Sequence, residues 1–148
     1  MLACTSLLCA TSTILACSNP PAPRAETPLA GGAPEILEIS APVYDPTGAR
    51  GDGPRLEAEC KRWSLTREQA GTFFRLSQPI TGEQKHHEFY YLPCSIRGRL
   101  RSDGHSWDFE INAAATATWS SGNEVRTFGC SDPACEPLVL MMPEAGAD

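Results

Sequence analysis

The sequence predicts an α+β domain, with a curved, mostly antiparallel sheet of about five or six strands, one helix on a face of that sheet, and two disulfides. Three observations lead to this prediction. Apolar and polar residues alternate along much of the second half of the chain, as they do in strands with one buried face. A single segment carries helix start and stop signals, and four cysteines remain once the apolar leader 1–17 is set aside.

The clearest strand pair lies within residues 96–111. Asp103-Gly104 is a strong two-residue hairpin turn, and it sets a register that places Leu100 opposite Trp107, Gly98 opposite Phe109, and Ile96 opposite Ile111. One face of the hairpin is then apolar, and the Phe109 ring can cover the Gly98 backbone. The other face places Arg97 opposite Glu110 and Arg99 opposite Asp108, which favours ion pairs over an anion-binding stripe that would include Arg101.

The alternation continues on both sides of this hairpin and predicts further strands. Upstream it covers residues 90–96, with Tyr90 pointing inward, and downstream it runs through residues 113–119. A turn at residues 120–123 is expected to send the chain back through a strand at residues 125–130. Earlier in the chain, the same pattern predicts two more strands, at residues 37–43 and 56–60.

One helix is predicted between these strands. Thr66 and Gln69 have the spacing of a capping box, and Pro79 ends the helical pattern. The side chains on one face of this helix are expected to pack against the sheet, and they are Ala70, Phe73, Phe74 and Ser77.

The four cysteines after the leader are expected to form two disulfides. In an oxidising compartment, an even number of cysteines favours disulfides, and four cysteines allow three pairings. Cys130 and Cys135 flank the turn signal Asp132-Pro133, which favours a local bridge and leaves Cys60 to pair with Cys94. A four-thiolate zinc site is the alternative, but it requires closely spaced pairs and only one pair here is close.

Residues 1–16 are interpreted as a signal peptide, because the leader is uncharged and too short to cross a bilayer permanently. Its end, Ile14-Leu15-Ala16-Cys17, resembles the lipobox of bacterial lipoproteins. The resemblance implies cleavage before Cys17, a lipid on the Cys17 thiol and, with Ser18 next, a position on the periplasmic face of the outer membrane. The alternatives are a cleaved signal that leaves Cys17 as a free thiol, or a buried apolar N-terminal helix.

The rest of the chain is expected to contain a tether, one domain and a tail. Residues 17–34 combine the lipidated cysteine with a Pro-rich stretch that could reach up to roughly 50 Å from the lipid surface. A single globular domain is expected at residues 35–143, followed by a short tail at 144–148. All acidic and basic residues follow Cys17, so the processed protein keeps the net charge of -6, which argues against a nucleic-acid partner.

The side chains that could take part in catalysis or metal binding form no recognisable catalytic motif. The alternative metal ligands are His86, His87 and His105, in a periplasmic metal-binding protein or a small enzyme. Their spacing matches no helical ligand motif, and a solvated strand edge is the expected setting of the histidine pair. Cysteines outside the reducing cytosol are expected to be oxidised, not nucleophilic. We therefore expect no metal and no cofactor, and a binding protein is favoured over an enzyme.

Outward-pointing aromatic residues form the candidate binding surface. If Tyr90 points inward, then Phe89 and Tyr91 point outward beside His87, on a strand that Pro93 interrupts. Exposed aromatic side chains on an edge-like strand have the composition of a recognition patch. The alternative is that the predicted helix packs over them.

The middle of the chain resembles a known group of proteins. It rests on His87-Glu88-Phe89 through Leu92-Pro93-Cys94, on Gly98-Arg99-Leu100-Arg101, and on Trp107. These residues look similar to small exported proteins of proteobacteria that have no assigned function. The resemblance implies an exported, cysteine-bridged domain and supplies no catalytic residue. Together with the tether, it favours a membrane-tethered periplasmic binding module, for instance an inhibitor or immunity-type protein, whose partner is a periplasmic protein or a cell-wall component.

Overall fold

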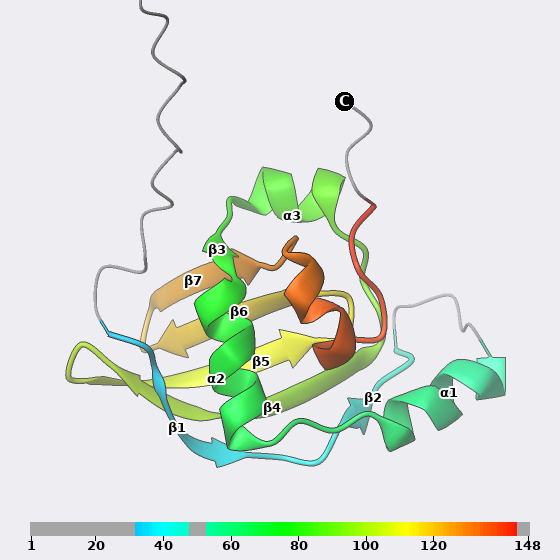
Figure 1. Cartoon of the computed structure of the whole chain (residues 1–148), viewed down its shortest axis with the longest axis horizontal. Helices are drawn as coiled ribbons and strands as arrows, with labels where there is room; N and C mark the ends of the chain where they lie inside the picture. Colours follow the sequence, from blue (N-terminus) through cyan, green and yellow to red (C-terminus); the bar gives the residue numbers. More distant parts are fainter. Residues whose placement is uncertain (1–31, 48–52, 145–148) are drawn as a thin grey trace, which may run out of the picture.

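An antiparallel sheet forms the centre of the fold, with helices against one face and around its ends (Figure 1). The computed structural model describes residues 32–47 and 53–144. The predicted α+β class, the antiparallel sheet and both disulfides are confirmed. The predicted signal peptide, the lipidation site Cys17 and nearly all of the tether lie outside the described residues, as does the end of the tail.

The sheet has seven strands, in the order β1-β4-β5-β6-β7-β3, with β2 also pairing with β4. All of the strand pairs are antiparallel. The strands are β1 (Glu35–Ile39), β2 (Val43–Tyr44), β3 (Gln78–Pro79), β4 (Cys94–Ser102), β5 (His105–Asn112), β6 (Thr116–Ser121) and β7 (Glu124–Gly129).

The predicted hairpin is confirmed as β4 and β5. Its register pairs Leu100 with Trp107, Gly98 with Phe109 and Ile96 with Ile111. A Cβ atom at Gly98 would overlap the backbone carbonyl oxygen of Glu38 and would lie 2.6 Å from the Phe109 ring, which explains the glycine. Arg97 forms the predicted ion pair with Glu110, with 2.6 Å between Nε and Oε2.

The β1 edge differs from the prediction in two respects. The expected strand at 37–43 is divided into β1 and β2, and the register shifts between Ile36 and Glu38. Because of this shift, Ile36 is the buried residue of β1 and Leu37 is only half-buried. Arg99 forms its ion pair across this edge with Glu38, at 2.6 Å, and not with Asp108, since β1 brings a second carboxylate alongside β4.

Helix α2 (Arg67–Leu76) is the predicted helix, and its capping box is confirmed. The Thr66 hydroxyl accepts from the Gln69 backbone N–H at 3.1 Å, and the Gln69 side chain accepts from the Thr66 N–H at 2.8 Å. Phe74 packs edge-on against three aromatic rings of the sheet, with centroid distances of 5.3 to 6.2 Å, and these belong to Phe109, Trp119 and Phe128. The helix therefore carries one side of the core.

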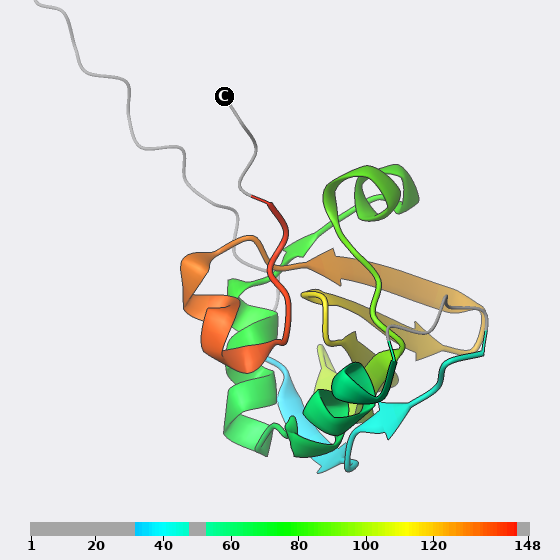
Figure 2. The same ribbon diagram turned by 90° about the vertical axis from the view of Figure 1, so that its right-hand side faces the viewer.

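More helical segments form than the single one expected: α1 (Gly53–Arg62), α3 (Gly82–Glu88) and the 3-10 helix η1 (Pro133–Leu138). Figures 1 and 2 show η1 beside α2 on the same face of the sheet, and α3 beyond the β7 edge. None of the helices within residues 32–47 and 53–144 has the length and apolar character that crossing a membrane would require.

The predicted strand at 56–60 is wrong, because these residues belong to α1. Leu56 and Cys60 are four residues apart, and that spacing fits one face of a helix as well as one face of a strand. Pro54 in the first turn and the ion pair between Lys61 and Glu57, at 2.6 Å, favour the helix. Cys60 is nevertheless buried, as expected.

The predicted continuous strand through residues 113–119 is also wrong, because the chain turns at residues 113–115 between β5 and β6. Ala115 has a φ of 64°, and the Asn112 side chain accepts from the Ala114 N–H at 3.0 Å. This side-chain hydrogen bond stabilises the turn, which contains no glycine from which it could be predicted. The next turn, at residues 120–123, is confirmed between β6 and β7.

Both disulfides fix a helix to the sheet. The first joins Cys60 of α1 to Cys94 at the start of β4, and the second joins Cys130, after β7, to Cys135 of η1. All four cysteines are buried. This pairing rules out the four-thiolate zinc alternative, because a sulfur in a disulfide is not available as a thiolate ligand.

Candidate functional site

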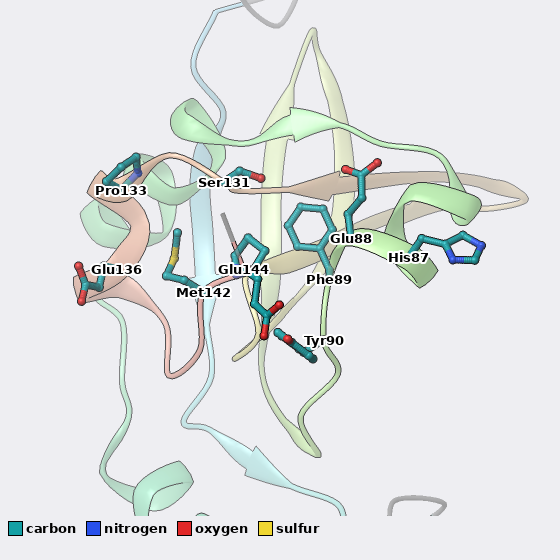
Figure 3. Close-up of a pocket in the computed structure, with 10 residues that line it drawn as sticks. His87, Glu88, Phe89, Tyr90, Ser131, Pro133, Glu136, Met142 and Glu144 are labelled. Carbon is teal, nitrogen blue, oxygen red and sulfur yellow. The ribbon is translucent and has the colours of Figure 1, made fainter. Parts of the chain in front are cut away.

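A groove of about 750 Å³ lies where α3, the end of β7, η1 and the C-terminal segment meet (Figure 3). Its lining combines apolar and aromatic side chains with carboxylates, principally Phe89, Tyr90 and Met142 with Glu88, Glu136 and Glu144. A smaller hollow of about 480 Å³ shares Glu88 and Phe89 with this groove and continues it toward β3. The site is therefore an open groove that can accommodate an extended ligand.

Helix α3 forms one wall of the groove, and it corrects the expected strand edge at His86 and His87. Thr81 and Gln84 form a second capping box, with hydrogen bonds of 3.1 and 2.9 Å, and this sequence signal could have identified the helix. None of the residues of α3 is buried. The helix is therefore polar on all sides and presents His87 and Glu88 at the groove.

The segment after α3 changes the predicted orientation of the aromatic residues. Because α3 ends at Glu88 and β4 begins only at Cys94, the alternation of a strand does not apply here. Tyr90, predicted to point inward, is 45% exposed, and Tyr91 is 64% exposed, as predicted. Phe89 is half-buried, because its ring lies against Gly129 at the end of β7, where a Cβ atom would overlap it.

Helix α2 does not cover these tyrosines. Phe73 and Phe74 of α2 are fully buried in the core, whereas Tyr90 and Tyr91 remain exposed. The sequence left two alternatives open, an exposed patch or burial under the helix, and Tyr91 is exposed. Phe89 instead forms part of the floor of the groove (Figure 3).

A buried asparagine holds the segment that carries the tyrosines. The Asn112 side chain accepts from the Leu92 N–H at 3.2 Å and donates to the Leu92 carbonyl at 2.6 Å. It also accepts from the Ala114 N–H in the adjoining turn. Leu92 is thereby tied to the β5–β6 turn as if it were in a strand ladder.

The C-terminal segment is tied to the same turn. The backbone N–H groups of Leu140 and Met141 both donate to the Ala113 carbonyl, at 2.9 and 3.0 Å. Just before them, the Trp63 indole N–H donates to the Leu138 carbonyl at 2.9 Å. Two segments far apart in sequence are thus fixed side by side at one end of the sheet.

Exposed apolar side chains are concentrated on these two segments. Within the described part of the chain, six large hydrophobic residues are exposed, and four of them are Tyr90, Tyr91, Leu140 and Met141. We call these four the exposed apolar surface. The other two, Val43 and Val125, belong to β2 and β7. Sequence reasoning missed Leu140 and Met141, although the apolar run from Pro137 to Met142 was a signal.

The groove is acidic. Glu88, Glu136 and Glu144 line it from three different elements, and Asp132 lines the adjoining hollow. His87 is the one basic side chain that contributes to the lining of the groove from the described residues. The hydrogen bond to the Glu144 carboxylate raises the pKa of Tyr90, because it stabilises the protonated phenol.

The three candidate histidine ligands are not brought together. His86 and His87 are neighbours on α3, with ring centroids 5.1 Å apart, whereas His105 begins β5 at the hairpin turn. Across residues 32–47 and 53–144, no group of three or more His, Cys, Asp or Glu side chains is arranged to hold a metal ion. Ser131 and His87 both line the groove, but no hydrogen bond joins their side chains among those formed by the described residues.

No family model, curated protein or solved structure matches the chain. The function is therefore inferred from the geometry and charge of the groove. What this arrangement offers is apolar contact area, carboxylates and a backbone fixed by hydrogen bonds, which are the properties of a binding site.

Proposed function

We propose that this protein is a binding module of the periplasm, tethered to the outer membrane, which captures a partner through the groove and the exposed apolar surface beside it. An inhibitor or an immunity-type protein is the kind of protein that this describes. The concentration of Tyr90, Tyr91, Leu140 and Met141 on two adjoining segments is the observation that carries the proposal. Exposed apolar side chains gathered in this way are typical of interaction surfaces.

The anchoring of these segments supports the proposal. Hydrogen bonds with the Asn112 side chain and to the Ala113 carbonyl hold both segments in place before a partner arrives. A surface that is already ordered loses less conformational entropy on binding, so more of the contact energy appears as affinity. Tyrosine also contributes a large contact area with few rotatable bonds.

The tether and the location of the protein rest on the leader. The resemblance of Ile14-Leu15-Ala16-Cys17 to a lipobox supports a lipid on Cys17 and attachment to the periplasmic face of the outer membrane. The two disulfides are consistent with this compartment, since disulfides persist in oxidising environments. In this proposal the partner is a periplasmic protein or a cell-wall component.

Photo-crosslinking tests the binding surface directly. We would place p-benzoylphenylalanine at position 91 of the full-length chain, in cells of its own host, and at position 125 as a matched control. Tyr91 and Val125 are both 64% exposed, so the two positions differ in location and not in exposure. We expect a discrete adduct from position 91 and none from position 125.

Substitutions in the same cells identify the groups responsible. Replacing Tyr90 and Met141 with alanine should abolish the adduct at position 91, because the partner loses contact area on both segments. Replacing His86 and His105 together, which do not line the groove, should leave the adduct intact. An adduct that survives the first substitution and disappears with the second would instead support a histidine-dependent site.

A further inference from the structure

The groove also indicates the chemistry of the partner, and this inference rests on the proposed binding function. We propose that the groove binds a cationic, extended segment of a protein partner, in which arginine or lysine alternates with apolar residues. The charge of the groove, the aromatic rings beside its carboxylates and its size all favour such a segment.

Among residues 32–47 and 53–144, no ion pair neutralises the carboxylates of the groove. The described part of the chain forms six ion pairs, and none of them includes Glu88, Glu136 or Glu144. The sheet contrasts with the groove, because Arg97 and Arg99 are matched there by Glu110 and Glu38. A partner that brings cations to the groove would therefore form new ion pairs without breaking existing ones.

Apolar rings lie among these carboxylates. Figure 3 shows the Phe89 ring between Glu88 and Glu144, with the Tyr90 phenol directed toward Glu144. Arginine and lysine side chains combine a charged head with an apolar stem, and the stem can pack on such rings while the head reaches a carboxylate. The exposed face of Tyr90 can also attract the cation directly. An anionic partner segment would face uncompensated repulsion here.

The dimensions favour a chain segment over a single small cation. The hollows of about 750 and 480 Å³ adjoin one another beside α3, since Glu88, Phe89, Ser131 and Pro133 line both of them. Tyr90 belongs both to the groove and to the exposed apolar surface, and a small cation would leave the rest of that surface uncovered. A protein segment can place its cations in the groove while the surrounding surface of the partner covers the tyrosines.

Fluorescence anisotropy of the full-length chain in detergent micelles tests the charge preference. The probe is a short fluorescein-labelled peptide in which arginines alternate with leucines, and its counterpart has glutamate in place of arginine. We expect the arginine peptide to bind and its binding to weaken as salt is added, while the glutamate peptide does not bind. Equal binding of the two peptides, or binding that salt does not change, would overturn the proposal.

A matched pair of variants locates the charge. The first carries Glu88→Gln, Glu136→Gln and Glu144→Gln, and the second carries Glu68→Gln, Asp103→Asn and Asp108→Asn, so both lose three negative charges. The acids of the second variant are exposed and do not line the groove. We expect the first variant to bind the arginine peptide roughly tenfold more weakly than the wild type. The second variant should lose less than about twofold in affinity. Equal weakening would attribute the effect to net charge and overturn the proposal.

The crosslink at position 91 separates this inference from the proposed function. In the variant that carries Glu88→Gln, Glu136→Gln and Glu144→Gln, called the groove variant, we expect no adduct, because the partner no longer binds. An adduct that persists in the groove variant would overturn the charge inference and leave the binding function standing, whereas no adduct in the wild type would overturn the function itself. An adduct within one chain, reaching the segment that contains Arg24, or between two copies, would show another occupant and also overturn the inference.

Discussion

Asn112 shows how one buried side chain can set the geometry of a surface. It is 6% exposed and forms three hydrogen bonds, of which two go to Leu92 and one to Ala114. Nothing in the local sequence distinguishes it from the polar residues expected at the end of a strand. Its partners are twenty residues upstream and two residues downstream, so its role becomes visible only when the segments are placed in space.

Replacing Asn112 with alanine is expected to lower the free energy of unfolding by about 1 to 3 kcal/mol, because the buried backbone groups of Leu92 lose their partners. Urea denaturation of the oxidised protein measures this. Asn123→Ala is the matched control, since Asn123 is exposed in a turn, and it should change stability by less than about 0.5 kcal/mol. Similar losses in the two variants would mean that the Asn112 hydrogen bonds contribute little.

Tyr90 provides a pH-dependent reporter of the groove. Its pKa is raised above 10.0 by the hydrogen bond to Glu144, so the contact is complete below the ordinary tyrosine pKa and is lost as the pH rises through the raised value. Glu144→Gln should lower the pKa of Tyr90, because glutamine offers no negative charge to stabilise the protonated phenol. Ultraviolet difference titration measures the shift, and Tyr90→Phe identifies which phenol is responsible. An unchanged titration in Glu144→Gln would exclude the contact.

At the scale of the elements, the sequence was most informative where several local signals agreed. The β4–β5 hairpin had a turn dipeptide, two alternating strands and opposed charges, and its register was predicted residue by residue. Helix α2 had a capping box, an apolar face and a proline after it. The long disulfide was also predicted correctly, although one of its cysteines was assigned to a strand and lies in a helix.

The errors occurred where one signal fitted two structures or was overridden by a distant contact. Leu56 and Cys60 fit either a helix or a strand, and a short run cannot distinguish the two. The β5–β6 turn depends on a side-chain hydrogen bond and on a positive φ at Ala115, a residue that rarely adopts it. The candidate groove could not be predicted either, because its walls come from segments that are distant in sequence, namely α3, η1 and the C-terminal segment.

The two disulfides are expected to differ in what they stabilise. Cys60–Cys94 closes a loop with a sequence separation of 34, and Cys130–Cys135 closes one of 5. Loop-closure entropy then predicts that replacing the first pair with alanine costs roughly 4 kcal/mol and replacing the second roughly 2 kcal/mol. Urea denaturation of the two double variants compares them. A larger loss from the short bridge would indicate that it acts through the packing of η1 and not through chain entropy.

At the scale of the whole molecule, strand β1 and the groove lie at opposite sides of the sheet. β1 forms one edge, and the chain enters the domain there at Glu35, whereas the groove adjoins β7 and α3 at the other side (Figure 1). We therefore expect a lipid anchor that precedes β1 in the sequence to leave the groove accessible to a partner. Attachment and binding can then be separated by mutation.

Cys17→Ser tests that separation. If Cys17 is the lipidated residue, the variant should remain an uncleaved precursor and should lose metabolic labelling by palmitate, because the hydroxyl does not replace the thiol as the acceptor. Its affinity for the arginine–leucine peptide should stay within about twofold of the wild type, since the groove lies away from the edge where the tether enters. Palmitate labelling that persists would contradict the lipidation of Cys17. Normal loss of labelling together with a large loss of peptide affinity would instead mean that the leader or its lipid contributes to the binding site.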